Sequence, residues 1–291
     1  MMKIEKNNVD ITNELSKCIY ETNIFNKPDS LKFNTNVSVV EEDIIELKAP
    51  FKSGALYPAK MKKMKLFDRY TCIASKVSLY EINNRTWRDV YLSQIITQIA
   101  RYHEMEVKLQ GFKDVKYTFM EQKSMSDIKF LNMLAKNEGY ILTFFDENIV
   151  FFKLDDFTNK NGSVYEVSTS DDFSFETKRP VFDGVSISIM DRTLIYAPST
   201  SKRKHLFKYV SQLPVTTEQQ ALSTAENIYK RLMLENTDGY LETANLDGFI
   251  AGTVISIRSN GKASDYLIIR SRHDLITGLN KYFLKRMVSE W

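Results

Sequence analysis

The stretch that decides the fold runs from Phe130 to Lys153 and reads FLNMLAKNEGYILTFFDENIVFFK. Its first part has the apolar spacing of an amphipathic helix that begins near Ser126 and ends before Gly139, where a residue with positive φ is favoured. Two apolar strands follow, Tyr140–Phe145 and Ile149–Lys153, and the polar residues between them predict a tight turn. Because a two-stranded hairpin alone is marginally stable in water, other parts of the chain must cover it.

Both faces of the predicted hairpin are apolar. Tyr140, Leu142 and Phe144 point to one side, and Ile141 and Phe145 to the other, since side chains alternate along a strand. An apolar face left in water would drive association. We therefore expect the helices of the same region to cover one face, and a second domain or subunit to cover the other.

Upstream of this stretch the sequence predicts another amphipathic helix. Thr86 and Asp89 fit a capping pair in its first turn. Its apolar face is formed by residues four apart: Trp87, Tyr91, Ile95 and Ile99. Two helices and a hairpin thus fill residues 85–156, which we expect to form one small domain.

The regions on either side of that domain are rich in strand-like runs. In residues 1–84 the runs are separated by turn residues, which predicts an antiparallel barrel or sandwich. These runs are Lys17–Thr22, Ser30–Phe33, Asp43–Lys48 and Tyr70–Glu81. Residues 157–291 add a helix capped by Thr217 and Gln220 and a hairpin around Asn260–Gly261. The expected fold class is α+β, with strand-rich domains at 1–84 and 157–291.

Composition and charge narrow the class of protein. The chain has 291 residues and a net charge of +3, which is too small to indicate a nucleic-acid or membrane partner by itself. Cys18 and Cys72 lack the spacing of a metal or redox site, so we expect free thiols in a reducing compartment. The N-terminus has no apolar signal segment, and no apolar run approaches the roughly 20 residues that span a bilayer.

The sequence offers no catalytic motif. His103 begins the stretch HEMEV, but a zinc-protease helix requires a second histidine four residues later, and none is present there. The other two histidines, His205 and His273, lie far away in the sequence. The pairs Asp155–Asp156 and Asp171–Asp172 are interpreted as solvated loop charges, because adjacent strand residues face opposite sides. We therefore expect no catalytic, cofactor-binding or metal-binding residue, no cofactor and no enzymatic activity.

Two basic runs, Lys60–Lys65 and Lys202–His205, could bind phosphate. Neither follows a helix period, and neither alternates with aromatic residues as single-strand binders do. The favoured interpretation is that each run is a solvated loop tip.

Residues 86–153 resemble the phage late control D family, the tail-hub proteins of contractile phages, R-type bacteriocins and related secretion spikes. The family's first helix motif, T-x-x-D-[IV] followed by I-A-x-x-[HY], is matched by Thr86, Asp89, Val90, Ile99, Ala100 and His103. Its second motif, S-D-x-x-F-L-x-x-L-A-x-x-x-G, is matched by Ser126, Asp127, Phe130, Leu131, Leu134, Ala135 and Gly139. The apolar hairpin then follows, as it does in the family.

The C-terminal region is similar to the same family. An Ala-rich helix at Ala221–Leu232, a glycine-led strand at Gly252–Ile257 and the residues Tyr266–Ile269 before His273 match its order of elements. No spike or needle segment is expected after Trp291.

The resemblance implies a structural protein. Hubs of this family form homotrimers in which each subunit contributes two tube-like β-barrels, here 1–84 and 157–291, around the helix-hairpin domain. Three subunits then present a pseudo-sixfold ring that joins the sixfold tail tube to the threefold central spike. The implied partners are the spike, the tail tube or tube-initiator protein and the baseplate wedge proteins, without specific nucleic acid or membrane insertion. Assembly would occur in the bacterial cytoplasm, and the released particle would carry the protein in its baseplate.

Two other functions stay open. A tail-associated peptidoglycan hydrolase would need a convergent acid pair or metal cluster, which the sequence does not display. A distal-tail or tube-initiator protein could share the barrels, but the helical region between them argues against it. The resemblance does not distinguish an infectious phage from a phage-tail-like bacteriocin.

Overall fold

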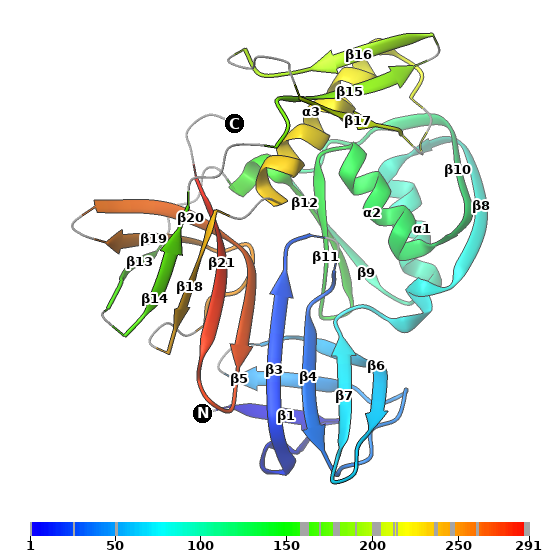
Figure 1. Ribbon diagram of the computed structural model, residues 1–291. Coiled ribbons are helices and arrows are strands. Elements are labelled where there is room, and N and C mark those ends of the chain that lie inside the picture. Colours follow the sequence, from blue (N-terminus) through cyan, green and yellow to red (C-terminus); the bar gives the residue numbers. More distant parts are fainter. Residues whose placement is uncertain are drawn as a thin grey trace.

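The first and last parts of the chain share one large β-sheet (Figure 1). The computed structural model describes residues 2–25, 27–49, 52–157, 163–168, 170–176, 181–189, 191–199, 205–211, 213, 215–235, 238–244, 248–259 and 262–287. The strands of this sheet are β1 (Lys3–Lys6), β2 (Val9–Asp10), β3 (Leu15–Asn23), β4 (Ser30–Thr35), β5 (Ile45–Ala49), β6 (Ala55–Lys63), β7 (Asp68–Ile73), β13 (Ser163–Glu166), β14 (Asp172–Phe175), β18 (Gly239–Thr243), β19 (Val254–Ser259), β20 (Lys262–Asp274) and β21 (Asn280–Arg286). They lie in the order β14-β18-β21-β20-β3-β4-β7-β6-β5-β1-β2, and β19, which pairs with β13, branches from β20.

The join between the two ends of the chain is the antiparallel pair of β3 and β20. Asn23 lies opposite Arg270, and Ile19 lies opposite Asp274. The sequence predicts two separate barrels, whereas the described strands of both regions form one sheet that curls through a half-barrel. A division into two closed barrels remains a prediction.

Three of the strands predicted in the first region are present. The runs Lys17–Thr22, Ser30–Phe33 and Asp43–Lys48 fall on β3, β4 and β5. The fourth run, Tyr70–Glu81, is wrong in its second half, because β7 ends at Ile73 and residues Val77–Tyr80 form the short 3-10 helix η2. The strand ends where its neighbours end, since Ile73 pairs with Ser30, the first residue of β4.

The middle region contains two helices between two small sheets (Figure 1). Its elements are β8 (Ile82–Tyr91), α1 (Leu92–Tyr102), β9 (Glu106–Gln110), β10 (Lys116–Ser126), α2 (Asp127–Asn137), β11 (Tyr140–Phe145) and β12 (Asn148–Lys153). Strands β8 and β10 form a long antiparallel ribbon. The predicted hairpin is confirmed as β11 and β12, and β9 extends it by pairing in parallel with β12.

The helix predicted to start at Thr86 starts later. Residues Thr86, Trp87 and Asp89 lie on β8, and α1 begins only at Leu92. Pairing with β10 gives these residues backbone partners that no local pattern reveals. The helix start is capped from a distance, because the backbone N–H and hydroxyl of Ser93 donate to the Asp114 carboxylate at 3.0 and 2.6 Å.

The glycine after α2 behaves as predicted. Helix α2 ends at Asn137, and Gly139 has φ +75°. This left-handed conformation is favourable for glycine and lets the chain turn directly into β11.

A third layer covers the middle region from above in Figure 1. Helix α3 (Glu218–Glu235) packs on a small sheet of β15 (Gly184–Ile189), β16 (Arg192–Tyr196) and β17 (Leu206–Tyr209). The Gln220 N–H donates to Thr217 Oγ1 at 3.1 Å, as predicted, but the Gln220 side chain accepts from the Thr216 N–H. The predicted turn at Asn260–Gly261 lies outside the described residues, and β19 and β20 on either side of it are paired. Within the described ranges, no helix is long and apolar enough to cross a membrane.

Candidate functional site

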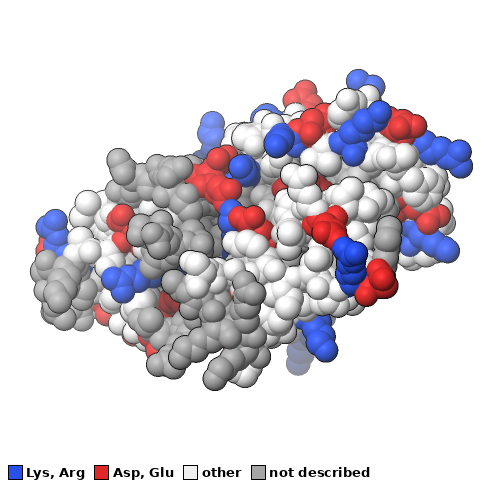
Figure 2. Space-filling view, turned by 90° about the horizontal axis from the view of Figure 1, so that it is seen from above, with Lys and Arg blue, Asp and Glu red and all other residues white. Residues whose placement is uncertain are grey.

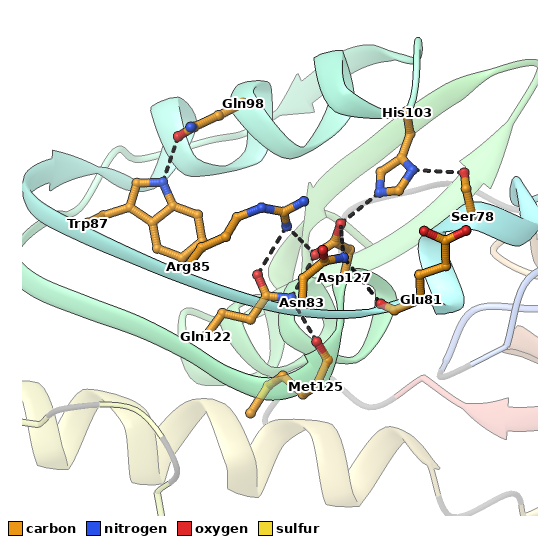
Figure 3. A network of polar contacts seen from close by, with 10 residues as sticks. All are labelled: Ser78, Glu81, Asn83, Arg85, Trp87, Gln98, His103, Gln122, Met125 and Asp127. Carbon is orange, nitrogen blue, oxygen red and sulfur yellow. Dashed lines mark hydrogen bonds and ion pairs between the residues drawn. The ribbon is translucent and has the colours of Figure 1, made fainter.

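A buried carboxylate holds the middle region together. Asp127 is the first residue of α2, and its side chain is fully buried. It accepts hydrogen bonds from His103 Nε2 at 2.7 Å, from Gln122 Nε2 at 2.7 Å and from Asn83 Nδ2 at 3.3 Å, and it forms an ion pair with Arg85 (Figure 3). Burial alone would raise the pKa of Asp127, but the bonds from His103, Arg85 and Gln122 outweigh it and lower the pKa. The group is therefore a fixed anion at neutral pH.

The elements that supply these donors come from different parts of the chain. Asn83 and Arg85 lie on β8, Gln122 lies on β10 and His103 follows the last turn of α1. One carboxylate thus ties both strands of the ribbon and the end of α1 to the start of α2 (Figure 3). The start of α2 also benefits from an acidic residue, because the helix dipole is positive there.

The network continues through His103 to the first region. The second ring nitrogen of His103, Nδ1, lies 2.8 Å from Ser78 Oγ on η2. Because Nε2 faces a carboxylate, it carries the proton, and Nδ1 accepts from the Ser78 hydroxyl. The hydrogen bond between Ser78 and His103 therefore holds η2, the segment between β7 of the large sheet and β8, in place.

Ser78, His103 and Asp127 have the composition of a hydrolase triad. His103 is only 3 % exposed, and both of its ring nitrogens are already bonded. Arg85 also neutralises the charge of Asp127. In a hydrolase triad the charge of the carboxylate instead stabilises the imidazolium that forms during the reaction. We interpret the arrangement as structural.

A second histidine lies at the join of the large sheet. His273 Nδ1 is 2.8 Å from Asn280 Oδ1, and Nε2 is 2.8 Å from Ser271 Oγ. Ser271 Oγ also lies 2.7 Å from Thr22 Oγ1 on β3, and the ring is packed between Tyr20 and Tyr282. His273, which the family resemblance singled out, thus belongs to a buried polar chain that links β20, β21 and β3.

The hairpin is covered on both sides by its own chain. Phe144, Ile149 and Phe151 belong to the core that the large sheet shares with the two helices. On the other face, Ile141 is buried in a second cluster, with Phe152 packed against it. That cluster brings together residues of the N-terminal and C-terminal regions: Ile24, Phe25, Leu234, Val254, Leu267 and Ile269.

The second face is not covered along its whole length. Phe145, next to the turn, is 41 % exposed. A cavity of about 400 Å³ lies between Val150 and Phe152 of β12 and residues 250–253. On this face the part around Ile141 is therefore covered by residues of the same chain, and the end near Phe145 is not.

The remaining residues singled out by sequence lie apart from these networks. Cys18 and Cys72 are both buried free thiols, and burial raises the pKa of each to about 12. His205 lies at the surface near Asp183, and Lys202–Lys204 fall outside the described residues. Among the residues that the structure describes, no group of three or more His, Cys, Asp or Glu side chains is placed to hold a metal ion.

The two acidic pairs do not form a shared site. Asp155 contacts Lys230 at 3.2 Å, and Asp171 accepts from the Tyr165 hydroxyl at 2.8 Å. The run Lys60–Lys65 is predicted to be a solvated loop tip; all of it is exposed, but of its four lysines only Lys65 lies in the turn after β6. Lys60, Lys62 and Lys63 lie on β6, paired with β7.

Sequence reasoning missed the partners of Asp127. It interpreted the Ser126–Asp127 pair as a helix start and found no role for Arg85 or Gln122. These residues approach Asp127 only because β8 and β10 pair, with Gln122 directly opposite Arg85. Strands β8 and β10 contain many polar residues, and the sequence does not identify which of them meet Asp127.

Comparison with known proteins shows where this fold occurs. No protein-family model matches the chain, and no curated protein matches it in sequence. The tail protein from Neisseria meningitidis MC58 is 10 % identical, with a TM-score of 0.74 over 100 % of this chain and 97 % of its own. The 43 kDa tail protein of prophage MuSo2 from Shewanella oneidensis is 12 % identical, with a TM-score of 0.72 over 98 % of both chains.

A secretion protein has a similar fold. The E. coli c3393 protein, described as a component of the type VI secretion system with structural similarity to the T4 tail proteins gp27 and gp5, is 11 % identical. Its TM-score is 0.61 over 99 % of this chain and 78 % of its own. In agreement with the resemblance found in the sequence, the chain has the β-rich fold of phage tail proteins and of this secretion component.

Proposed function

We propose that the protein is the structural baseplate hub of a contractile phage tail or of a phage-tail-like bacteriocin. In this role three copies form an adapter between the sixfold tail tube and the threefold central spike. The observation that carries the proposal is the likeness to tail proteins over essentially the whole chain. The hub motifs in residues 86–153 support it independently.

The large sheet suits such an adapter. It contains two runs of four strands, β3-β4-β7-β6 and β20-β21-β18-β14, which meet at the β3–β20 pair. Three copies would present six such runs, so that a threefold assembly could match a sixfold tube. Beyond Leu56, no described strand pairs with the outer edge of β6, and none pairs with the outer edge of β14. Open edges of this kind favour association between copies.

The finer features of the role are part of the same proposal. The partners would be the central spike, the tail tube or its initiator and the baseplate wedge proteins, after assembly in the bacterial cytoplasm. The chain would act without catalytic, cofactor or metal residues. The division into 1–84, 85–156 and 157–291 would separate two tube-like domains from a helix-hairpin domain.

Oligomeric state tests the proposal. Size exclusion with light scattering should give three copies of the chain, alone or with its spike. The partner to use is a spike protein encoded in the same gene cluster, identified by sequencing the flanking genes, because trimer formation would depend on it if the free chain is a monomer. A monomer that persists with the spike present would contradict the hub function.

A peptidoglycan hydrolase is the second candidate, favoured only by the Ser78–His103–Asp127 arrangement. The purified protein should fail to clear a suspension of cell walls. Clearing that is lost in Ser78→Ala would replace the structural proposal with an enzymatic one.

A further inference from the structure

The basic run on β6 belongs to a larger group of cations on the exposed face of the large sheet. Strand pairing places two rows of side chains on this face. The first row is Lys17, Asn34, Arg69 and Lys62, and the second is Ile19, Lys32, Thr71 and Lys60. We call the five cations Lys17, Lys32, Lys60, Lys62 and Arg69 the basic rows. Lys17, Lys60, Lys62 and Arg69 are exposed, and Lys32 is half-buried.

The charge of the basic rows is not balanced within the sheet. On this face of β3, β4, β6 and β7 the one acidic side chain is Glu21. Its carboxylate is shared by Lys32 at 2.6 Å, Arg270 at 3.3 Å and Arg272 at 3.9 Å. In the other half of the sheet, Lys281 has Glu242 at 3.0 Å. The basic rows therefore carry an excess of positive charge, whereas Lys281 in the other half of the sheet has an acidic partner of its own.

One contact in the rows opposes folding. Arg69 and Lys62 lie directly opposite each other on neighbouring strands. Like charges in this position destabilise a strand pair. Arg69 Nε donates to Asn34 Oδ1 at 3.1 Å, but this neutral partner does not cancel the charge of either cation. An anion on this face would relieve the repulsion.

The surface seen from above differs from this face. There, acidic and basic side chains are interspersed (Figure 2). Mixed charges are usual for a solvated surface, whereas a one-signed field steers a charged partner.

We propose that the basic rows bind the phosphate backbone of nucleic acid, without reading its sequence. The rows combine Lys and Arg with the half-buried Thr71, and these are residue types that contact phosphate oxygens. Asn34 is only 5 % exposed, and its Oδ1 accepts from Arg69 Nε at 3.1 Å, so that it positions Arg69. The rows contain no aromatic side chain on which an unpaired base could stack, so duplex is preferred to single strand. Four strands span about 14 Å, and a duplex carries one charge per about 1.7 Å, so that five phosphate contacts fit.

A protein partner is the competing explanation. Lysine is depleted in protein interfaces, and Ile19, the apolar member of the rows, is only 5 % exposed. A groove of about 370 Å³ does lie beside Lys60, lined in part by Ile73, Val77 and Tyr80. An acidic peptide with an apolar anchor could use both features, and the experiment below separates it from nucleic acid.

Fluorescence anisotropy of a labelled 30-base-pair DNA duplex with the full chain tests the proposal. With five phosphate contacts, the logarithm of the binding constant should fall against the logarithm of salt concentration with a slope of about −4.5, which is about 500-fold between 50 and 200 mM. The double variant Lys60→Gln/Lys62→Gln should reduce the slope to about −2.7 and weaken binding equally for unrelated sequences.

A matched variant controls for net charge. Lys108→Gln/Lys123→Gln removes two exposed lysines from β9 and β10 and should leave binding and slope unchanged. Circular dichroism should show that both double variants fold. Equal losses in the two variants would show a general charge effect and overturn the site, as would absence of DNA binding at 25 mM salt.

Unlabelled poly-L-glutamate identifies the alternative partner. If it binds with Lys60 and Lys62 required while the duplex does not bind, the surface recognises acidic protein, and the proposal is wrong. The measurement does not depend on trimer formation, so its failure leaves the hub proposal standing.

Discussion

At the scale of single residues, the most consequential group is one carboxylate. Asp127 accepts hydrogen bonds from two strands and from the end of a helix, and of these partners only Gln122 is near it in sequence, whereas His103, Asn83 and Arg85 are distant. A buried ion pair adds little stability compared with an apolar pair, but removal of one partner leaves the other charge uncompensated. The effect of a substitution on stability therefore depends on whether the other charged partner remains buried without a counter-ion.

Asp127→Ala should lower the free energy of unfolding by about 3 kcal/mol, because Arg85 would remain with its side chain only 18 % exposed and without its counter-ion. The double variant Asp127→Ala/Arg85→Ala should be less destabilised than the sum of its single variants. Urea denaturation measures both. Asp89→Asn, at an exposed position of β8, is the control and should change stability by less than about 0.5 kcal/mol. Equal effects of Asp127→Ala and the control would contradict the role of the network.

Asp29 predicts a pH dependence of stability. Burial raises the pKa of Asp29 to about 7, against hydrogen bonds from the Asn23 N–H and the Tyr20 hydroxyl. Between its ordinary value near 4 and this pKa, the folded state binds a proton that the unfolded state does not. The stabilising contribution is therefore present at low pH and is lost as the pH rises through 7.

The melting temperature should fall between pH 5 and pH 8, and Asp29→Asn should flatten that fall. At pH 8 the variant should melt higher than the wild type, because its side chain cannot ionise. Parallel curves for the two proteins would show that Asp29 titrates normally.

At the scale of elements, Gly139 forms the turn between the end of α2 and the start of β11. It has φ +75°, and an added Cβ would lie 2.5 Å from Asn227 Oδ1 on α3. Asn227 in turn donates to the Asn137 carbonyl at 2.9 Å, so that it closes the end of α2 from outside. Backbone strain and a steric clash thus act at the same position.

Gly139→Val should cost at least about 2 kcal/mol, and Gly139→Ala somewhat less. Gly278→Ala is the matched control, because Gly278 has φ +74° with no atom within 4 Å of an added Cβ. The difference between the two alanine variants in thermal unfolding reports the clash with Asn227. If they cost the same, Asn227 moves aside freely and only the backbone matters.

The hairpin provides a test along its two faces. Phe151 is fully buried in the main core, whereas Phe152 is half-buried against the Ile141 cluster. Phe151→Glu should abolish folding, and Phe152→Glu should destabilise the chain or impair particle assembly. Phe145→Glu is the control and should be tolerated, since Phe145 is 41 % exposed. Normal folding and assembly of Phe152→Glu would show that this face is free.

The elements also show what could be predicted from sequence. Helix α2, Gly139 and the hairpin follow from spacing within the continuous stretch Asp127–Lys153, and the structure confirms them. The segment after Thr86 was misassigned because the apolar spacing of Trp87 and Tyr91 fits a helix, while pairing with β10 makes it a strand. Strand β9 was missed for the same reason, since its parallel partner β12 lies beyond a whole helix. The local sequence pattern indicates the spacing of apolar residues, but it does not identify the distant strand that pairs with a segment.

At the scale of the whole molecule, the three regions 1–84, 85–156 and 157–291 share their apolar cores. The main core extends from the first strands of the large sheet through both helices to the hairpin. The Ile141 cluster then joins the hairpin to α3 and β20. The three regions are therefore packed against each other through apolar residues, which is compatible with the adapter role proposed above.

The pairing of β3 with β20 has a consequence for synthesis. Thr22 and Ser271, which meet at 2.7 Å, are separated by 249 positions, so β3 is synthesised long before its partner β20 leaves the ribosome. Until then β3 presents an open edge, and long-range pairing of this kind is slow and prone to aggregation. Chains interrupted before β20 would lack the strand that completes the sheet. Quality control is thereby built into the topology, because a truncated chain cannot complete the large sheet.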